Sequence, residues 1–295
     1  MTEPLVRTRD AATVLLLREA AGGLEVFLVK RHGSSGFMGG AHVFPGGKVD
    51  PADAQLGPRV VACDLPKTLG GLAQTPGRVR NDEVPLGLYV AAIREVHEEA
   101  GVLLARRRDG KPLDAAALAR IEAARKGTPP FAQLIEQEDL VLDLDALVPW
   151  AHWITPSRET RRFDTHFFLT RAPSDQTASF DAHETTESEW LSPRAALERH
   201  EAGSIFLPPP TLVSLTEMSS FATVDAALDA ARARPIMAIL PKLGAIGENI
   251  AIVMPWDSTY AAMEGASLPT QDPHPMASDI SRVTLIGERW RAGRG

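Results

Sequence analysis

Residues 94–102 read Arg-Glu-Val-His-Glu-Glu-Ala-Gly-Val, and Phe44-Pro45-Gly46-Gly47 precedes them by about fifty residues. At helical spacing, Glu95, Glu98 and Glu99 share one face, because residues three and four apart are neighbours on a helix. Carboxylates crowded in this way repel one another unless a cation neutralises them. Hard divalent ions such as Mg²⁺ prefer carboxylate oxygens. The segment therefore predicts a metal platform of the type that handles phosphates, with an ordinary solvated helix face as the alternative.

The residues before this segment favour a helix over Leu88–Ala100. Tyr89, Ile93, Val96 and Ala100 recur at steps of four, three and four and form one apolar stripe. Gly101 stands where a C-terminal capping glycine is expected. The glutamates lie off the stripe, so one face of the helix packs and the other, with His97, is expected to be exposed.

The composition bounds the class of protein. The chain has 295 residues, 44% hydrophobic and 23% charged, with a net charge of −7. This field does not favour a nucleic acid polymer as partner. The lone Cys63 excludes an intrachain disulfide and fits a reducing compartment. No apolar run reaches the ~18–20 residues that a membrane-spanning helix requires, and the N-terminus has no signal-peptide pattern. A cytoplasmic location without membrane association is expected.

Elements of both kinds surround the central helix. Gly and Pro separate the predicted segments, and residues 53–86 are typical of an inserted loop with little regular structure. Strands before and after the helix predict an α/β (α+β) sandwich with mixed strand pairing. The expected strands are 11–18, 24–31, 42–44, 151–154, 163–170, 188–191, 236–240 and 249–254, the expected helices are 114–126, 131–138, 193–201, 211–219 and 224–232, and residues 258–278 are expected to form a loop.

Together these residues resemble the signature of the Nudix hydrolases, which runs Gly, five residues, Glu, seven residues, then Arg-Glu-aliphatic-any-Glu-Glu-any-Gly-aliphatic. Arg94 to Val102 matches at every fixed position, and Gly47 matches the first glycine. Asp53 replaces the usual glutamate, and forty residues separate it from Arg94, so the signature carries an insertion of thirty-three residues. This interruption resembles a subgroup that includes a peroxisomal coenzyme A diphosphatase and its bacterial relatives. The resemblance covers about residues 10–255, including Trp153–Pro156 and Arg161–Phe168.

The resemblance implies a Nudix-type α/β/α sandwich over residues 1–210. It places insertions at 54–86 and about 113–140, with a helical and stranded extension over 211–295 packed on the same domain. It also implies roles for individual residues. Glu95, Glu98, Glu99 and the carbonyl of Gly46 would ligate Mg²⁺ or Mn²⁺. Arg94 would orient the glutamates, and Gly47 would allow a backbone turn that a side chain blocks.

The implied activity is hydrolysis of a diphosphate in a small nucleotide derivative, most simply coenzyme A or acyl-coenzyme A. ADP-ribose, NADH or a nucleoside triphosphate is the alternative within the class. A non-catalytic nucleotide-binding module is the alternative outside it. In a coenzyme A-type pattern, Arg31, Gly40 and Phe44–Gly47 keep the spacing, whereas Gly36 stands where arginine is expected. The resemblance also allows a homodimer.

Further residues are expected near the substrate. Lys30, Arg31, Gly47 and the pair Arg161-Arg162 would contact phosphates, and Trp153 is either a core residue or a stacking surface for a base. The general base would be one of the three glutamates of the signature, or a residue of the acidic segment Glu184, Glu187 and Glu189. The histidines show no zinc-ligand spacing.

Overall fold

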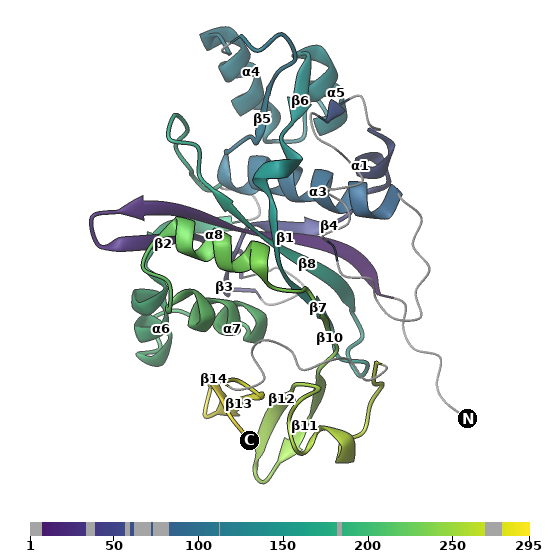
Figure 1. The fold of residues 1–295 in the computed structure, drawn as a ribbon, viewed down its shortest axis with the longest axis vertical. Coiled ribbons are helices and arrows are strands. Elements are labelled where there is room, and N and C mark those ends of the chain that lie inside the picture. The colour runs from purple at the N-terminus through teal and green to yellow at the C-terminus, as the bar shows by residue number, and fades with distance from the viewer. Residues whose placement is uncertain are drawn as a thin grey trace.

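The computed structural model describes residues 8–33, 39–56, 60–61, 72, 83–111, 113–181, 185–268 and 279–295. A mixed sheet of eight strands forms the centre of the molecule (Figure 1). Its main path runs β10-β7-β8-β1-β2-β3, while β4 pairs with β1 and β9 pairs with β2. The strands are β1 (Arg9–Ala20), β2 (Gly23–Arg31), β3 (His42–Val43), β4 (Gly46–Lys48), β7 (Val148–Ile154), β8 (Phe163–Arg171), β9 (Thr185–Leu191) and β10 (Ala238–Ile239).

Strand β1 organises this sheet. Its second half forms an antiparallel hairpin with β2, with Leu17 opposite Val26. Its first half pairs with β4 instead. Strands β2 and β4 therefore pair with successive parts of the same side of β1. On its other side β1 runs parallel to β8, in register from Arg9–Phe163 to Leu17–Arg171. This parallel pair, like the pair of β10 with β7, lies among antiparallel ones, which confirms the predicted mixed sheet.

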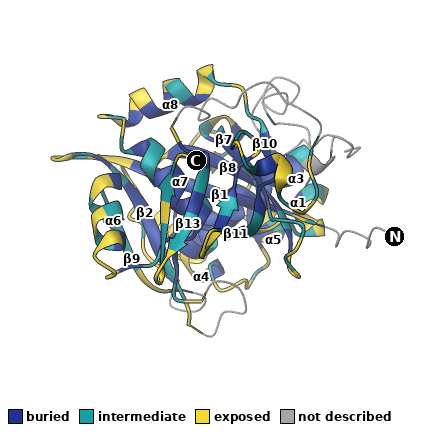
Figure 2. Cartoon of the chain, turned by 90° about the horizontal axis from the view of Figure 1, so that it is seen from below, coloured by how far each residue is buried: buried dark blue, intermediate teal, exposed yellow. Residues whose placement is uncertain are grey.

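Helices cover both faces of the sheet. They bury the side chains that β1 presents on each side. Ala12, Val14 and Leu16 belong to a core with α3 (Glu83–Ala100). Leu15 and Leu17 belong to a second core with α7 (Pro209–Met218) and α8 (Val224–Ala233). Alternate strand residues point to opposite faces, so a strand covered on both faces reads as one apolar run. The buried strands lie between partly exposed helices in Figure 2, which confirms the α/β/α sandwich.

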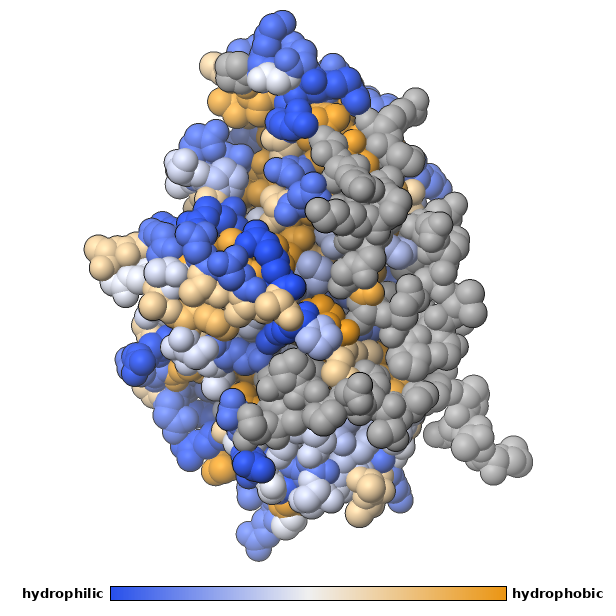
Figure 3. Space-filling model, in the orientation of Figure 1, coloured by the Kyte–Doolittle hydropathy of each residue, from blue (hydrophilic) through white to orange (hydrophobic). Residues whose placement is uncertain are grey.

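The outer helices show the expected amphipathic pattern. In α8, Val224, Ala227, Leu228 and Ala231 are buried at helical spacing. Asp225, Asp229 and Arg232 are exposed on the opposite side of α8, where Figure 3 shows hydrophilic groups beside apolar ones. Among the described residues, no helix combines the length and the hydropathy that crossing a bilayer requires.

Helix α3 begins earlier than the predicted Leu88 and ends at Ala100, as expected. Gly101 adopts a φ of +70° and donates its N–H to the carbonyl of His97 at 3.0 Å, which is the capping role predicted for it. The prediction that His97 is exposed was wrong, since only 1% of it is accessible. The insertion helix α4 (Ala115–Ala124) covers it, and the His97 Nε2 lies 2.9 Å from the Ile121 carbonyl oxygen.

The insertion at about 113–140 is helical, as expected. It contains α4 and α5 (Phe131–Gln137) and is flanked by two short paired strands, β5 (Ala105–Arg107) and β6 (Leu140–Leu142). A short 3₁₀ turn, η2 (Leu144–Ala146), follows. The expectation of little regular structure over 53–86 was wrong at both ends. Helix α1 (Pro51–Gln55) includes Asp53, and α3 starts before residue 86. Most of 57–82 lies outside the described residues, including Cys63.

The C-terminal part contributes to the central sheet and adds a second one. After α6 (Pro193–Glu201), α7 and α8, strand β10 joins the edge of the main sheet parallel to β7. A four-stranded antiparallel sheet follows, made of β11 (Lys242–Ile246), β12 (Asn249–Val253), β13 (Arg282–Ile286) and β14 (Arg289–Gly293). Strands β11, β13 and β14 escaped the sequence prediction because they are short and only partly buried. The expected loop over 258–278 includes a 3₁₀ turn, η3 (Tyr260–Ala262).

Candidate active site

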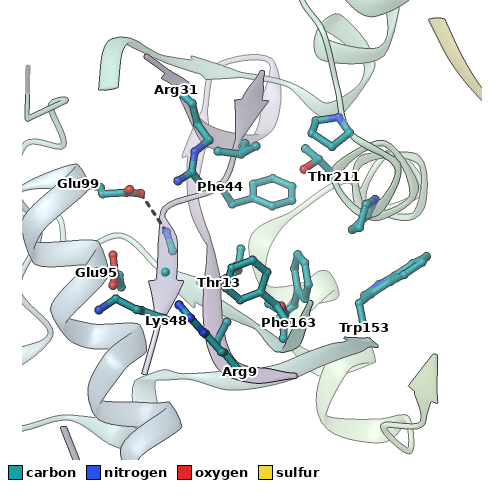
Figure 4. A pocket seen from close by; sticks show the side chains of 18 of the residues that line it. Arg9, Thr13, Arg31, Phe44, Lys48, Glu95, Glu99, Trp153, Phe163 and Thr211 are labelled. Atoms are coloured by element: carbon teal, nitrogen blue, oxygen red, sulfur yellow. Dashed lines mark hydrogen bonds between the residues drawn. The ribbon is translucent and has the colours of Figure 1, made fainter. Parts of the chain in front are cut away.

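A cavity of about 860 Å³ opens where β1 passes between α3, β4 and the C-terminal part (Figure 4). Its wall combines segments that are far apart in the sequence. One end is lined by the carboxylates of α3 and by β4, and the other by β7, β8, the start of α7 and the C-terminal sheet. The segment singled out by its sequence pattern therefore lies at one end of a substrate-sized cavity.

The three glutamates of α3 share the face that lines this cavity, as predicted. Glu95 and Glu99 are 8% and 5% accessible, and the side chain of Glu98 is 29% accessible. Glu99 accepts a hydrogen bond from the backbone N–H of Gly46 at 3.0 Å, which places this glycine beside the carboxylates (Figure 4). Two chain segments that are separated by the insertion thus meet at one polar site.

Arg94 fixes the positions of two of these carboxylates, Glu95 and Glu98. Its Nη1 donates to Glu95 Oε1 at 2.7 Å and to Glu98 Oε2 at 2.9 Å. Its Nε and Nη2 donate to the two oxygens of Asp53 at 2.9 and 3.0 Å. Burial works to lower the pKa of Arg94, but the hydrogen bond to Asp53 and the charge of Glu95 raise it above its ordinary value. Asp53, which is 2% accessible, therefore serves here as the buried partner of Arg94.

Gly47 is needed for space and not for a turn. It lies in β4 opposite Ala12, without the left-handed φ that a glycine turn would require. A Cβ on residue 47 would lie 2.4 Å from Glu95 Oε1 and 2.6 Å from Glu95 Cδ. The expectation of a turn that a side chain blocks was therefore wrong in its reason, because Glu95 occupies the space of the missing side chain.

Besides Arg94, the basic residues that line the cavity include Arg9, Arg31 and Lys48, which Figure 4 labels, and Arg125 and Lys126. Arg31 was expected from its spacing to Phe44–Gly47. Arg9 was missed, because it belongs to no motif and reaches the cavity only through the parallel pairing of β1 with β8. The cavity thus combines clustered carboxylates with cations, which is the arrangement needed to hold a metal ion and an anionic phosphate together.

The comparison with known families agrees with this geometry. The family model described as the NUDT19 Nudix domain matches residues 8–218, which is more than half of the chain. The chain belongs to the Nudix hydrolase family. It is therefore a hydrolase that acts on diphosphates, and Nudix hydrolases generally depend on divalent metal ions.

Curated relatives of this Nudix hydrolase include the acyl-coenzyme A diphosphatase NUDT19 of Gallus gallus, 34% identical over 76% of this chain and 71% of the relative. The Homo sapiens protein of the same name is 31% identical over 70% of this chain and 63% of the relative. Among solved structures, a NUDIX hydrolase from Alicyclobacillus acidocaldarius is 27% identical, with a TM-score of 0.60. That match covers 77% of this chain and 97% of the other.

The donor set of this Nudix hydrolase fits a divalent cation. Three hard carboxylates line one cavity, and residue 47 carries no side chain that would displace Glu95. The residues that could hold a metal ion are thus Glu95, Glu98, Glu99 and, through its carbonyl, Gly46.

Other predicted site residues lie elsewhere. Arg162 is buried, and its Nε donates to the carbonyls of Thr155 and Pro156 at 3.1 and 3.2 Å. Burial lowers its pKa. Neither Arg162 nor Arg161 is among the described residues that line the cavity. Arg162 therefore supports the β7–β8 connection. Neither arginine of the pair lies in the cavity wall, where the expected phosphate contact would be made.

The described glutamates of the acidic segment, Glu187 and Glu189, are also not among the residues that line the cavity. Glu187, on β9, is exposed and pairs with Lys30 at 2.9 Å, and this hydrogen bond lowers its pKa. Glu189 pairs with Arg199. Glu184 and Gly36 lie outside the described residues. Lys30 thus contacts a carboxylate, whereas its neighbour Arg31 reaches the cavity.

The structure groups three residues that showed no ligand spacing in the sequence. Among the described residues, ligand atoms of His152, Asp164 and His166 all lie within 4.8 Å of one another. The glutamates of α3 do not reach that spacing. His152 is hydrogen-bonded to Asp164, and its ring stacks on that of His166 with centroids 3.9 Å apart. Phe167 lines the cavity from the adjacent position of β8, so this buried cluster lies on the opposite face of the strands.

Proposed function

We propose that this Nudix hydrolase uses divalent metal to cleave the diphosphate of coenzyme A or acyl-coenzyme A. The observation that carries the proposal is the cavity itself, in which three carboxylates, two of them held by Arg94, face basic side chains and adjoin a larger space for an organic group. The acyl-coenzyme A diphosphatase relatives supply the choice of substrate class. The chain spans 63% of the length of the human relative. The activity named for that relative is therefore stated for this chain only as a proposal.

Each residue has a defined part in this proposal. Glu95, Glu98, Glu99 and the Gly46 carbonyl hold Mg²⁺ or Mn²⁺, whose charge, when bound, offsets that of the diphosphate and acidifies a water molecule. Arg94 keeps Glu95 and Glu98 in position. Of the cations that line the cavity, Arg9, Arg31 and Lys48 bind phosphate oxygens.

The reaction needs only water as co-reactant. The oxygen of a water molecule bonds to one phosphorus, and the bridging P–O bond breaks, leaving two phosphate monoesters. The proton of the water passes to a general base. We assign this base to the glutamates of α3, since they line the cavity, whereas Glu187 pairs with Lys30 outside it. Glu184 and Glu187 remain the alternatives.

A substrate panel tests the proposal. The protein is assayed with coenzyme A, acetyl-coenzyme A, ADP-ribose, NADH and ATP, each with Mg²⁺ or Mn²⁺ and with a chelator. Expected products are 3′,5′-ADP and the phosphopantetheine derivative, and the chelator abolishes their formation. AMP with ribose 5-phosphate would instead identify ADP-ribose as the substrate.

Variants test the site itself. Glu98→Gln and Glu99→Gln are expected to lower kcat by at least about a hundredfold, because each removes a charge that the metal requires. Glu248→Gln, in the exposed β11–β12 turn, is the control. Full turnover in both cavity variants, or no turnover of any substrate by the wild type, would favour the binding-module alternative.

The proposal also covers the class of substrate, the cellular location and the oligomeric state of the enzyme. The substrate is a small molecule, and the net charge of −7 argues against a nucleic acid polymer. A cytoplasmic location and a homodimer complete it. Fractionation and light scattering, respectively, measure these two properties.

A further inference from the structure

The cavity has two chemically different ends. Glu95, Glu99 and Lys48 lie at one end in Figure 4, while Phe163 and Trp153 lie toward the other, with Phe44 between. Phosphate oxygens belong with the cations and carboxylates. If the diphosphate binds there, as the proposed function requires, an organic part of the substrate faces the aromatic end.

The wall of this second end suits hydrocarbon. Pro208, Pro209 and Pro210 line it in succession, and Pro241 adds a fourth proline. A proline has no backbone N–H, so these positions cannot donate hydrogen bonds to a purine edge. Aromatic and aliphatic side chains make up much of the remaining surface, with the polar Thr155, Glu159, Thr165 and Thr211 among them. Recognition of a base needs fixed donors and acceptors, whereas an alkyl chain needs only apolar surface.

The C-terminal sheet completes this wall. Ile252, on β12, lines the cavity and packs against the apolar core that contains Phe44, Trp153 and Phe167. Pro241 immediately precedes β11. Both residues lie beyond residue 218, where the match to the Nudix family model ends. A segment outside the matched domain therefore shapes the organic end of the cavity.

We propose that this apolar end, formed by Phe44, Trp153, Phe167, the 208–210 prolines and Ile252, binds the acyl chain of an acyl-coenzyme A. Ile252 on the C-terminal sheet limits the length of chain that fits. The proposal rests on the proposed diphosphatase function. Each methylene group that enters the apolar end contributes about fourfold to kcat/KM until the chain reaches the end of the cavity.

A chain-length series tests this binding site. Hydrolysis of coenzyme A and of its acetyl, butanoyl, hexanoyl, octanoyl and lauroyl thioesters is measured below micelle-forming concentrations. The wild type is expected to show kcat/KM that rises with chain length and then levels off. In Ile252→Trp, the larger side chain fills the apolar end, and the ratio of kcat/KM for the octanoyl thioester to that for coenzyme A falls at least tenfold.

Two further variants distinguish an effect on the binding site from an effect on folding. Ile250→Trp changes the same residue type two positions earlier in β12, where Ile250 is 50% accessible, and is expected to keep the wild-type ratio. Ile252→Ala enlarges the space and is expected to shift the plateau to longer chains. A flat series in the wild type, or equal ratios in Ile252→Trp, Ile252→Ala and the wild type, would overturn the binding site while leaving the diphosphatase intact. No turnover of any thioester or of coenzyme A would overturn the proposed function itself.

Discussion

Gly47→Ala probes the site without changing any charge. A Cβ at residue 47 would lie 2.4 Å from Glu95 Oε1, whereas real Cβ atoms essentially never come within 3.0 Å of another heavy atom. The carboxylate must therefore retreat by at least 0.6 Å, and by about 1 Å to regain an ordinary contact. The same displacement strains its 2.7 Å hydrogen bond to Arg94.

A displacement of about 1 Å at a reacting centre costs about a hundredfold in rate, or about 2.7 kcal/mol of transition-state stabilisation. The fold is expected to keep its stability, because alanine in a strand loses less conformational entropy on folding than glycine. Gly47→Ala should thus lower kcat about a hundredfold and weaken the apparent metal affinity, with an unchanged Tm. Initial rates under metal titration, together with thermal denaturation, measure these effects.

Two other glycines, Gly46 beside Gly47 and Gly22 in the β1–β2 turn, provide the contrast. A Cβ at Gly46 would lie 2.5 Å from the carbonyl oxygen of Ala12, so Gly46→Ala disturbs the β1–β4 pairing and should lower Tm. A Cβ at Gly22 would meet nothing within 4 Å, so Gly22→Ala should change neither property. If Gly47→Ala retained a third or more of the wild-type kcat, Glu95 would not need the position that it has in this structure.

Three further predictions concern charged and titrating groups. Arg94→Lys loses the paired bonds to Asp53 and should lower the free energy of unfolding in urea by about 3 kcal/mol; a loss below about 1 kcal/mol would contradict this. His42 has a pKa lowered mainly by burial. Below about pH 6.5 the unfolded chain therefore binds its proton first, and stability falls by up to about 1.4 kcal/mol per pH unit. His42→Gln should make this decline shallower between pH 6.5 and 5.5, and equal slopes would exclude His42 as a cause. Glu187→Gln removes the surface pair with Lys30 and should keep kcat within threefold, whereas a larger loss would restore Glu187 as general base.

Helix α3 and its carboxylates could be predicted because their information is local. The apolar stripe from Tyr89 to Ala100 and the position of Gly101 follow from helical spacing alone, and the glutamates share a face for the same reason. The two hydrophobic strands β1 and β2 were equally clear. Such features depend on residues that are neighbours in the sequence, and the tertiary structure left them almost unchanged.

The surroundings of the helix could not be predicted in this way. His97 follows the pattern of an exposed position, but the inserted α4 packs against it and buries it. Asp53 differs from the expected glutamate, yet it holds Arg94 across the insertion. Both outcomes depend on contacts between segments whose distance in sequence says nothing about their distance in space.

The sequence by itself determined the central helix, its carboxylates and the family, because motif and periodicity are properties of short segments. Only the tertiary structure decided that Arg9 and Ile252 line the cavity and that Gly47 leaves room for Glu95. The reason is strand register. The parallel pairing of β1 with β8 and the packing of the C-terminal sheet bring these residues together, and neither leaves a pattern within one segment.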